Sequence, residues 1–321
     1  MAEGRKTPWV HNPKTFLFAA AVGVIGGLVG TLFQVGSFGL QHLLIGPGSL
    51  LQAALALPWW KALLIPFVGG IAAMLIGWGL TRRHKAQGMS DVMEAVNLKR
   101  VQNLRPTSVL ARAASSLALI ATGGSVGREG PIVYMSASFG SALARLGRFA
   151  GPRLGLFAGC GVAAGMSSAY FAPFGATLFA MEVVLGNFAV DILAPVVVAS
   201  VVSSLVVRGL ASPDLLGDWM KGPPVYELPA FQESRPTEYL IYLLLGFSAA
   251  AGAWLFVRAM TSTETFFRRL PVPVWARLPL GGLVIGALGI SLPHVWGNGY
   301  DAVNLVLKET PSLQFVVLLF L

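Results

Sequence analysis

Long apolar stretches separated by short polar connections dominate the chain. No Asp, Glu, Lys or Arg occurs between Lys14 and Lys61. Further runs free of these residues cover Ala62–Thr81, Leu154–Met181, Ile192–Val207, Tyr239–Val257 and Leu278–Tyr300. A helix needs about 20 apolar residues to cross a bilayer, so the first run predicts one long tilted helix and part of a second. The alternating strands typical of a membrane barrel do not occur in the sequence.

Composition narrows this pattern to one class. The 321 residues are 55% hydrophobic and 12% charged, with a mean hydropathy of +0.70. We therefore predict an all-α polytopic membrane protein in contact with the lipid bilayer. The net charge of +9 is scattered over connections such as Arg82-Arg83-His84-Lys85. This distribution is typical of positive-inside anchoring, and we expect no nucleic-acid binding.

A weak internal repeat divides the chain. Three blocks recur in order: Phe16…Phe33 with Tyr239…Phe256, Pro66…Gly70 with Pro279…Gly282, and Gly88…Asp91 with Gly297…Asp301. Membrane transporters commonly use repeats of opposite topology, with the substrate site where the halves meet. We predict an N-terminus at 1–14, a first transmembrane repeat at 15–210, a proline-rich extramembrane connection at 211–236 and an incomplete second repeat at 237–321. The sequence stops within an apolar run, so we expect a partial polypeptide.

One charged segment lies between two apolar runs, at Gly123-Gly124-Ser125-Val126-Gly127-Arg128-Glu129-Gly130-Pro131. Charge at membrane depth is expensive and marks function. The segment predicts a broken helix: a short first part over Ala113–Thr122, and a second starting at Pro131 and ending near Arg145. The free amides and dipole of the second helix favour an anion. Glu129 could occupy that anion site as a gate released by protonation, or could pair with Arg128 to hold a loop.

Two other segments could contribute to an anion site or an ion route. Gln87, Gly88 and Met89 form a predicted turn before a short amphipathic helix, which Ser90 could cap with Asp91 in the first turn. Its N-terminus could face the anion or be a plain interfacial cap. Pro173 is predicted to start a helix that ends near Glu182, which could be an ion-pair partner or part of an ion route. Cys160 lies alone in an apolar run and is expected to be a packing residue.

These residues together resemble the chloride channel and chloride/proton antiporter (CLC) family. Gly127-Arg128-Glu129-Gly130-Pro131 resembles its most specific motif, and Ala172-Pro173…Leu178-Phe179-Ala180-Met181-Glu182 resembles the helix that follows. The resemblance covers nearly the whole chain. It implies a homodimer with one pore per subunit, each built from two inverted repeats. Two further anion-site elements, a Gly-x-Phe-x-Pro segment and a later tyrosine, are expected beyond Leu321.

The resemblance also implies roles for particular residues. Glu129 matches the gating glutamate, and the backbone amides of Gly127, Arg128, Glu129, Gly130 and Ile132 match one wall of the anion site. Gln87, Gly88 and Met89 stand in the family's Gly-Ser-Gly-Ile-Pro motif but depart from it, with Gln87 where a serine often meets the anion. The identity of the anion, chloride or another small anion, therefore stays open. The family's internal proton glutamate falls on Val183, next to Glu182, and a valine cannot carry a proton.

Gated, pH-sensitive conduction of chloride is the function that we predict from these features. Proton-coupled antiport of chloride or another anion is the alternative, and a non-conducting fragment is a third possibility. An intramembrane enzyme would need a nucleophile or metal cluster at depth, and the sequence offers no convincing one. We expect no enzyme activity, cofactor or metal. Arg5, Lys6 and Lys14 precede the first apolar run and predict a cytoplasmic N-terminus. We expect the protein to lie in the inner membrane of a bacterium.

Overall fold

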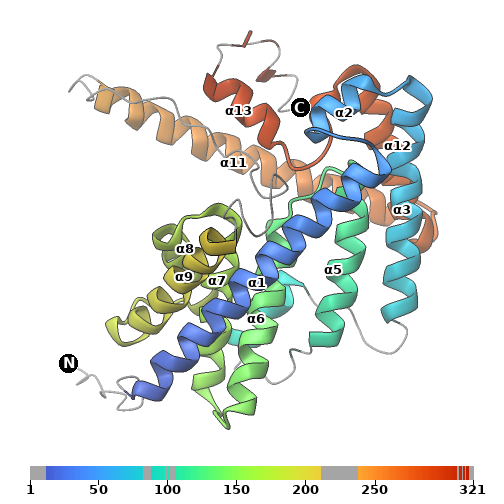
Figure 1. Ribbon diagram of the computed structural model, residues 1–321. Coiled ribbons are helices and arrows are strands. Elements are labelled where there is room, and N and C mark those ends of the chain that lie inside the picture. The colour runs from blue at the N-terminus through green and yellow to red at the C-terminus, as the bar shows by residue number, and fades with distance from the viewer. Residues whose placement is uncertain are drawn as a thin grey trace.

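The computed structural model describes residues 12–81, 88–97, 100–101, 104, 106–210, 238–308, 311–312, 314 and 316–317. Its regular elements are all helical within these ranges (Figure 1). The predicted connection at 211–236 and Gln87 lie outside the described residues. The elements are α1 (Pro13–Leu44), α2 (Leu50–Ala56), α3 (Trp59–Thr81), α4 (Met89–Asn97), α5 (Pro106–Ala121), α6 (Glu129–Leu146), α7 (Pro152–Tyr170), α8 (Pro173–Phe179), η2 (Ala180–Leu185), α9 (Val190–Leu210), α11 (Glu238–Arg269), α12 (Val274–Ser291), η4 (Pro293–Val295) and α13 (Tyr300–Lys308).

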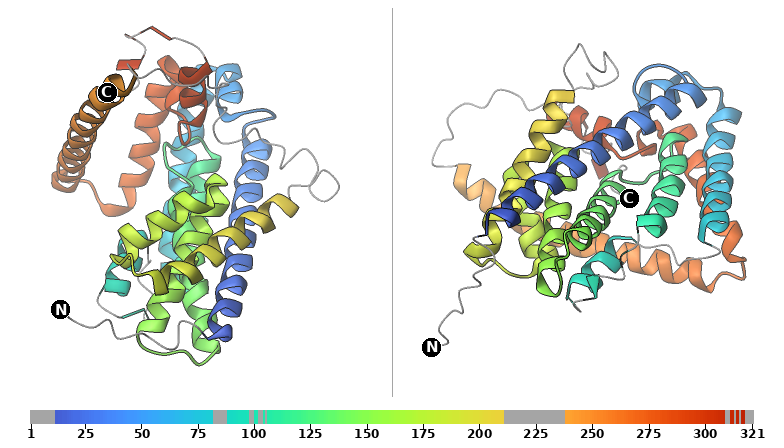
Figure 2. Two further views of the ribbon diagram at one scale, coloured as in Figure 1. Left: turned by 90° about the vertical axis from the view of Figure 1, so that its left-hand side faces the viewer. Right: turned by 60° about the horizontal axis from the view of Figure 1, so that its bottom comes forward.

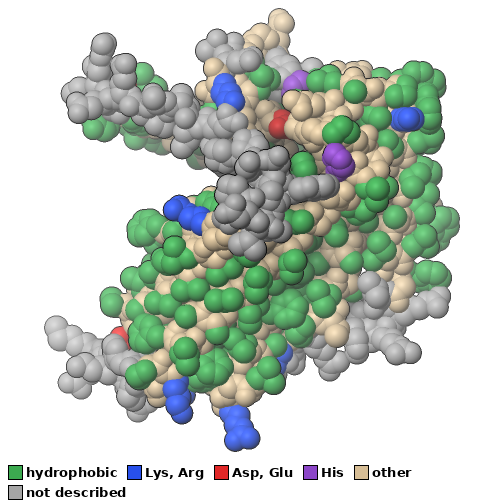
Figure 3. Space-filling model, viewed as in Figure 1, with side chains coloured by type: hydrophobic (Ala, Val, Ile, Leu, Met, Phe, Trp, Pro, Cys, Tyr) green, Lys and Arg blue, Asp and Glu red, His purple; other side chains and the backbone are tan. Residues whose placement is uncertain are grey.

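Five of the described helices are long and apolar enough to cross a membrane. They lie at Pro13–Leu44, Trp59–Gly79, Val190–Leu210, Glu238–Arg269 and Val274–Ser291. Hydrophobic side chains also dominate the face of the molecule shown in Figure 3, as contact with lipid tails requires. The prediction of a polytopic helical membrane protein is therefore confirmed, including the long first helix between Lys14 and Lys61.

Helices of the first copy pack tightly around α6 and α7. The long helix α1 runs obliquely across this group and contacts α5, α6, α7 and α9 (Figures 1 and 2). Buried hydroxyls join α7 and α9, since Ser203 Oγ donates to the Ala164 carbonyl at 2.7 Å and Ser167 Oγ donates to the Ser200 carbonyl at 2.8 Å. Small residues and interhelical hydrogen bonds are the usual means by which membrane helices associate. Cys160 is fully buried in α7, as expected of a packing residue.

Some helices of the predicted second copy resemble those of the predicted first copy in length or in the place of a proline. The first helices α1 and α11 each have 32 residues, and the short helices α4 and α13 each have nine. The intervening helices α3 and α12 each contain an internal proline, Pro66 and Pro279. These are the blocks in which the sequence repeat was recognised.

The two copies meet where α3 packs against α12. A Cβ on Gly70 would lie 2.6 Å from the Leu278 carbonyl oxygen and 2.9 Å from the Pro279 Cα, and a Cβ on Gly282 would overlap the Pro66 carbonyl. The proline region of each helix thus contacts the glycine of the other. A reciprocal contact of this kind is what the predicted repeat leads us to expect.

Candidate functional site: a broken helix facing the second copy

The charged segment lies between two helix ends. Helix α5 ends at Ala121, and Gly123 follows in the left-handed region with φ +85°. The amides of Gly123 and Gly124 close the helix by donating to the carbonyls of Ile120 and Leu119 at 3.1 and 2.8 Å. A left-handed glycine after the last turn is the common way to end a helix. The predicted break is therefore present, although α5 begins at Pro106 and not near Ala113.

Helix α6 begins at Glu129, two residues before the predicted start at Pro131. Proline is tolerated anywhere in the first turn, because an amide there has no partner within the helix. Arg128 occupies the N-cap and makes no side-chain cap hydrogen bond. Pro131 has no amide, and the Ile132 amide reaches the Arg128 carbonyl only at 3.4 Å. The amides of Glu129 and Gly130 therefore stand at the positive end of the helix dipole.

The Glu129 side chain folds back over the turn that precedes it. A Cβ on Gly127 would overlap Glu129 Oε2, so only glycine leaves room for the carboxylate there. The other carboxylate oxygen, Oε1, accepts a hydrogen bond from the Tyr300 hydroxyl. The Arg128 guanidinium lies 4.8 Å from the centre of the Tyr300 ring, and its Nε is buried without a partner among the described residues. Glu129 thus connects the N-terminus of α6 to the start of α13.

The segment before α13 is docked onto the same turn. Trp296 is 4% exposed, and a Cβ on Gly123 would lie 2.5 Å from its ring. The next residue, Gly297, donates its amide to the Gly123 carbonyl at 3.2 Å. These contacts bring the second-copy block Gly297–Asp301 to the charged segment of the first copy. The role of Tyr300 was not predicted from the sequence, although its block was recognised as the counterpart of Gly88–Asp91.

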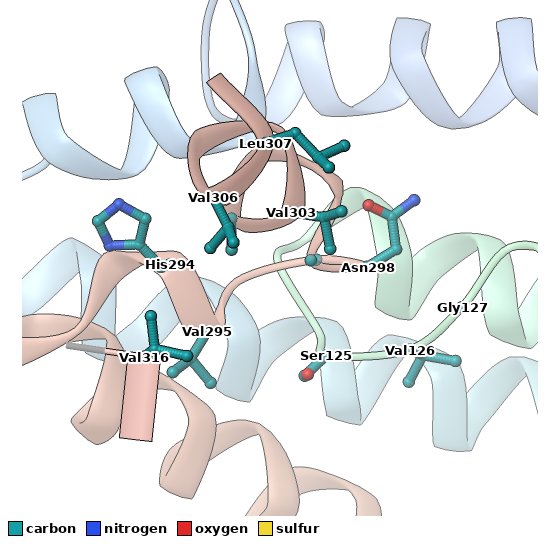
Figure 4. Close-up of a pocket in the computed structure, with 13 residues that line it drawn as sticks. Ser125, Val126, Gly127, His294, Val295, Asn298, Val303, Val306, Leu307 and Val316 are labelled. Atoms are coloured by element: carbon teal, nitrogen blue, oxygen red, sulfur yellow. The ribbon is translucent and has the colours of Figure 1, made fainter. Parts of the chain in front are cut away.

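A cavity of about 570 Å³ opens beside this turn. Figure 4 shows Ser125 and Val126 on one side of the cavity and Val303 and Val306 of α13 on the other. Its remaining lining includes His294, Asn298 and Val316. Among the described residues, no group of three or more His, Cys, Asp or Glu side chains could hold a metal ion.

The other predicted anion-site residues have different surroundings. Gly88 is buried beside Arg112 of α5, and its amide donates to Asp91 Oδ2 at 2.7 Å. The expectation that Ser90 caps this helix is wrong. Because α4 begins at Met89, Ser90 lies inside the first turn, and the Gly88 amide just before the helix donates to Asp91. An anion at this helix would have to compete with the Asp91 carboxylate.

Glu182 and Val183 lie in η2, the π-helical turn that continues α8 and packs against α4 and α7. Both side chains are exposed. The structure therefore places them with α4, whereas the described contacts of the Glu129 carboxylate are with Tyr300 and Gly127.

A charged, glycine-flanked break at a helix N-terminus is typical of membrane proteins that hold an anion or ion site within a helical bundle. The model of the voltage gated chloride channel family matches residues 69–321. The chain belongs to this family. This confirms the family that the motif around Glu129 suggested.

Relatives and solved structures agree with this membership. The chain is 37% identical over 293 residues to a ClcB-like protein of Ralstonia nicotianae, covering 89% of this chain and 66% of the relative. It is 32% identical to the voltage-gated ClC-type chloride channel ClcB of Citrobacter koseri, covering 96% and 72%. The chain thus spans about two thirds of the length of these curated relatives. In fold it is similar to a slow cyanobacterial Cl⁻/H⁺ antiporter (TM-score 0.75, 18% identity, 96% and 71% covered) and a CLC-type fluoride/proton antiporter (0.71, 22%, 96% and 74%).

Proposed function

We propose that this chain forms part of a gated anion pathway, for chloride in the first instance, with Glu129 as the gate. The observation that carries the proposal is the position of the Glu129 carboxylate, folded over Gly127 at the N-terminus of α6. A carboxylate there resembles a bound anion, because it places negative charge at the positive end of a helix dipole. When it leaves, the same place becomes available to a free anion.

The backbone supplies the rest of the proposed site. Amides of Gly127, Arg128, Glu129, Gly130 and Ile132 would form one wall of the anion site. Conduction needs sites attractive enough for an ion to enter and weak enough for it to leave. Partial charges on amides suit this need better than a guanidinium in direct contact, and the Arg128 guanidinium lies over the Tyr300 ring instead.

Protonation would release this gate. A neutral carboxyl group gains less from the helix dipole than a carboxylate does. We therefore propose that anion flux rises as the pH falls. The rate of anion flux through the protein would then depend on pH without a metal or cofactor.

Proton-coupled antiport is the second function to be tested, because two solved structures with this fold are antiporters. The residue at the position of the family's internal proton glutamate is Val183, which cannot carry a proton, so passive flux is favoured. A chloride gradient that drives protons uphill in liposomes would establish antiport. We further propose that the protein works as a homodimer with a cytoplasmic N-terminus, as the resemblance and the early basic residues imply.

Chloride efflux from liposomes carrying the full chain tests the gate. We expect Glu129→Gln to raise efflux at neutral pH and to remove its pH dependence, because a neutral amide mimics the protonated state. Glu264→Gln is the matched control, since Glu264 pairs with Arg268 at 2.7 Å on the exposed helix α11. If Glu129→Gln and the wild type show the same efflux and the same pH response, Glu129 is not the gate.

A further inference from the structure

We propose that Tyr300 is the positioning residue that holds the Glu129 gate in its folded-back position. The inference rests on the proposed function of Glu129 and adds a partner from the other copy of the repeat. The Tyr300 hydroxyl donates to Glu129 Oε1, across 171 residues of sequence. To leave the turn, the carboxylate must break this hydrogen bond.

Tyr300 is fixed in place by the backbone before it. Gly297 and Gly299 both adopt left-handed conformations, with φ +78° and +77°, which glycine alone adopts without strain. The Gly297 amide is bound to the Gly123 carbonyl, and Trp296 is packed against Gly123. The tyrosine therefore starts α13 from an anchored turn, and its hydroxyl is held against Glu129 without a large loss of side-chain freedom.

Arg128 completes the arrangement from the first copy. Its guanidinium lies over the Tyr300 ring at 4.8 Å, within the range of a cation–π contact. This contact orients the ring, and the positive charge partly balances the carboxylate beside it. Glu129, Arg128 and Tyr170 all lie close enough to Tyr300 to interact with it electrostatically.

The hydrogen bond sets how firmly the gate is held. A hydrogen bond to a charged group stabilises a folded arrangement enough to shift an equilibrium about 10- to 100-fold. Removing the hydroxyl should therefore move the gate toward its released position by that factor. Phenylalanine at this position keeps the ring and its contact with Arg128, so the substitution isolates the hydroxyl.

A double-mutant cycle on chloride efflux tests the inference. We expect Tyr300→Phe to raise efflux about tenfold at neutral pH in the otherwise wild-type chain. It should have no effect when combined with Glu129→Ala, because alanine leaves no acceptor for the hydroxyl. Tyr242→Phe is the matched control: it removes a hydroxyl that donates to Glu238 at 3.1 Å on exposed α11, and efflux should not change. Equal melting temperatures of the variants would show that the fold is intact.

The outcomes separate the two proposals. If Glu129→Gln changes efflux but Tyr300→Phe does not, or if the effects of Tyr300→Phe and Glu129→Ala multiply, the gate stands and the role of Tyr300 is refuted. If Glu129→Gln itself changes nothing, the gate is refuted and the inference falls with it. Replacing Tyr300 with 3-fluorotyrosine gives a second test that preserves the fold. It strengthens the hydroxyl as a donor, so efflux should slow, and an unchanged rate would also count against the inference.

Discussion

Replacing Gly123 with alanine should destabilise the protein more than its small size suggests. Gly123 has φ +85°, and a Cβ there would lie 2.5 Å from Trp296 Cε3 and 2.8 Å from Cδ2. Trp296 has no space to retreat, because a Cβ on Gly289 would overlap its Nε1 on another side. The indole is thus held between the backbones of α12 and of the turn after α5.

Two separate contributions make up the expected loss. A non-glycine residue in the left-handed region costs about 1–2 kcal/mol. Forcing an extra methyl group into a packed site costs about another 1–3 kcal/mol. Together they predict a loss of about 2–5 kcal/mol in the free energy of unfolding.

Gly186→Ala provides the control for this measurement. Gly186 also has a left-handed backbone, with φ +58° and ψ +25°, but a Cβ there meets nothing within 4 Å. It should lose the backbone contribution alone. Apparent melting temperatures in detergent, taken at one heating rate because unfolding of such proteins is often irreversible, should fall clearly further for Gly123→Ala. Equal decreases would show that Trp296 does not pack on Gly123, and Trp296→Leu should reduce the difference if it does.

Two further comparisons each pair a closely packed glycine with one that has open surroundings. On α12, Gly282→Ala should lower the melting temperature, because its methyl group meets the backbone of α3. Gly281→Ala places its methyl group in open space and should raise the free energy of unfolding by up to about 1 kcal/mol through helix propensity. The reverse order of melting temperatures would refute the described contact of α3 with α12. In the turn, Gly127→Ala should displace the Glu129 carboxylate and raise chloride efflux with little change in melting temperature. Gly246→Ala on the exposed helix α11, where a Cβ meets nothing within 4 Å, should leave efflux unchanged. Equal efflux in both variants would contradict the folded-back position.

Local sequence patterns predicted much of the fold. The absence of charge after Lys14 predicted α1, and the glycines at 123 and 124 predicted the end of α5, because both depend on residues close in sequence. The start of α6 was misplaced by two residues, since a proline such as Pro131 fits any position of the first turn. Ser90 was also misjudged, because α4 begins one residue earlier, at Met89, and Ser90 therefore lies inside its first turn.

The site was harder to predict than the helices. Glycine and charge spacing identified Glu129 as the unusual carboxylate, but its partner Tyr300 comes from a distant part of the chain. Nothing in the local pattern distinguishes this tyrosine from one that faces lipid. The available signal was the predicted repeat, because transporters built from repeats commonly place the substrate site where the two copies meet. That signal indicates the block but not the atom that makes the contact.

The packing of α1 has a consequence for the order of assembly during synthesis. The described helices that pack most closely against it, α5, α6, α7 and α9, precede residue 211, so this group can form before α11 leaves the ribosome. Helix α3 is different, because it packs against both α5 and α12. The side of α3 that packs against α12 therefore faces lipid until α12 is inserted. During this interval, the glycine-containing side of α3 can contact helices of other membrane proteins.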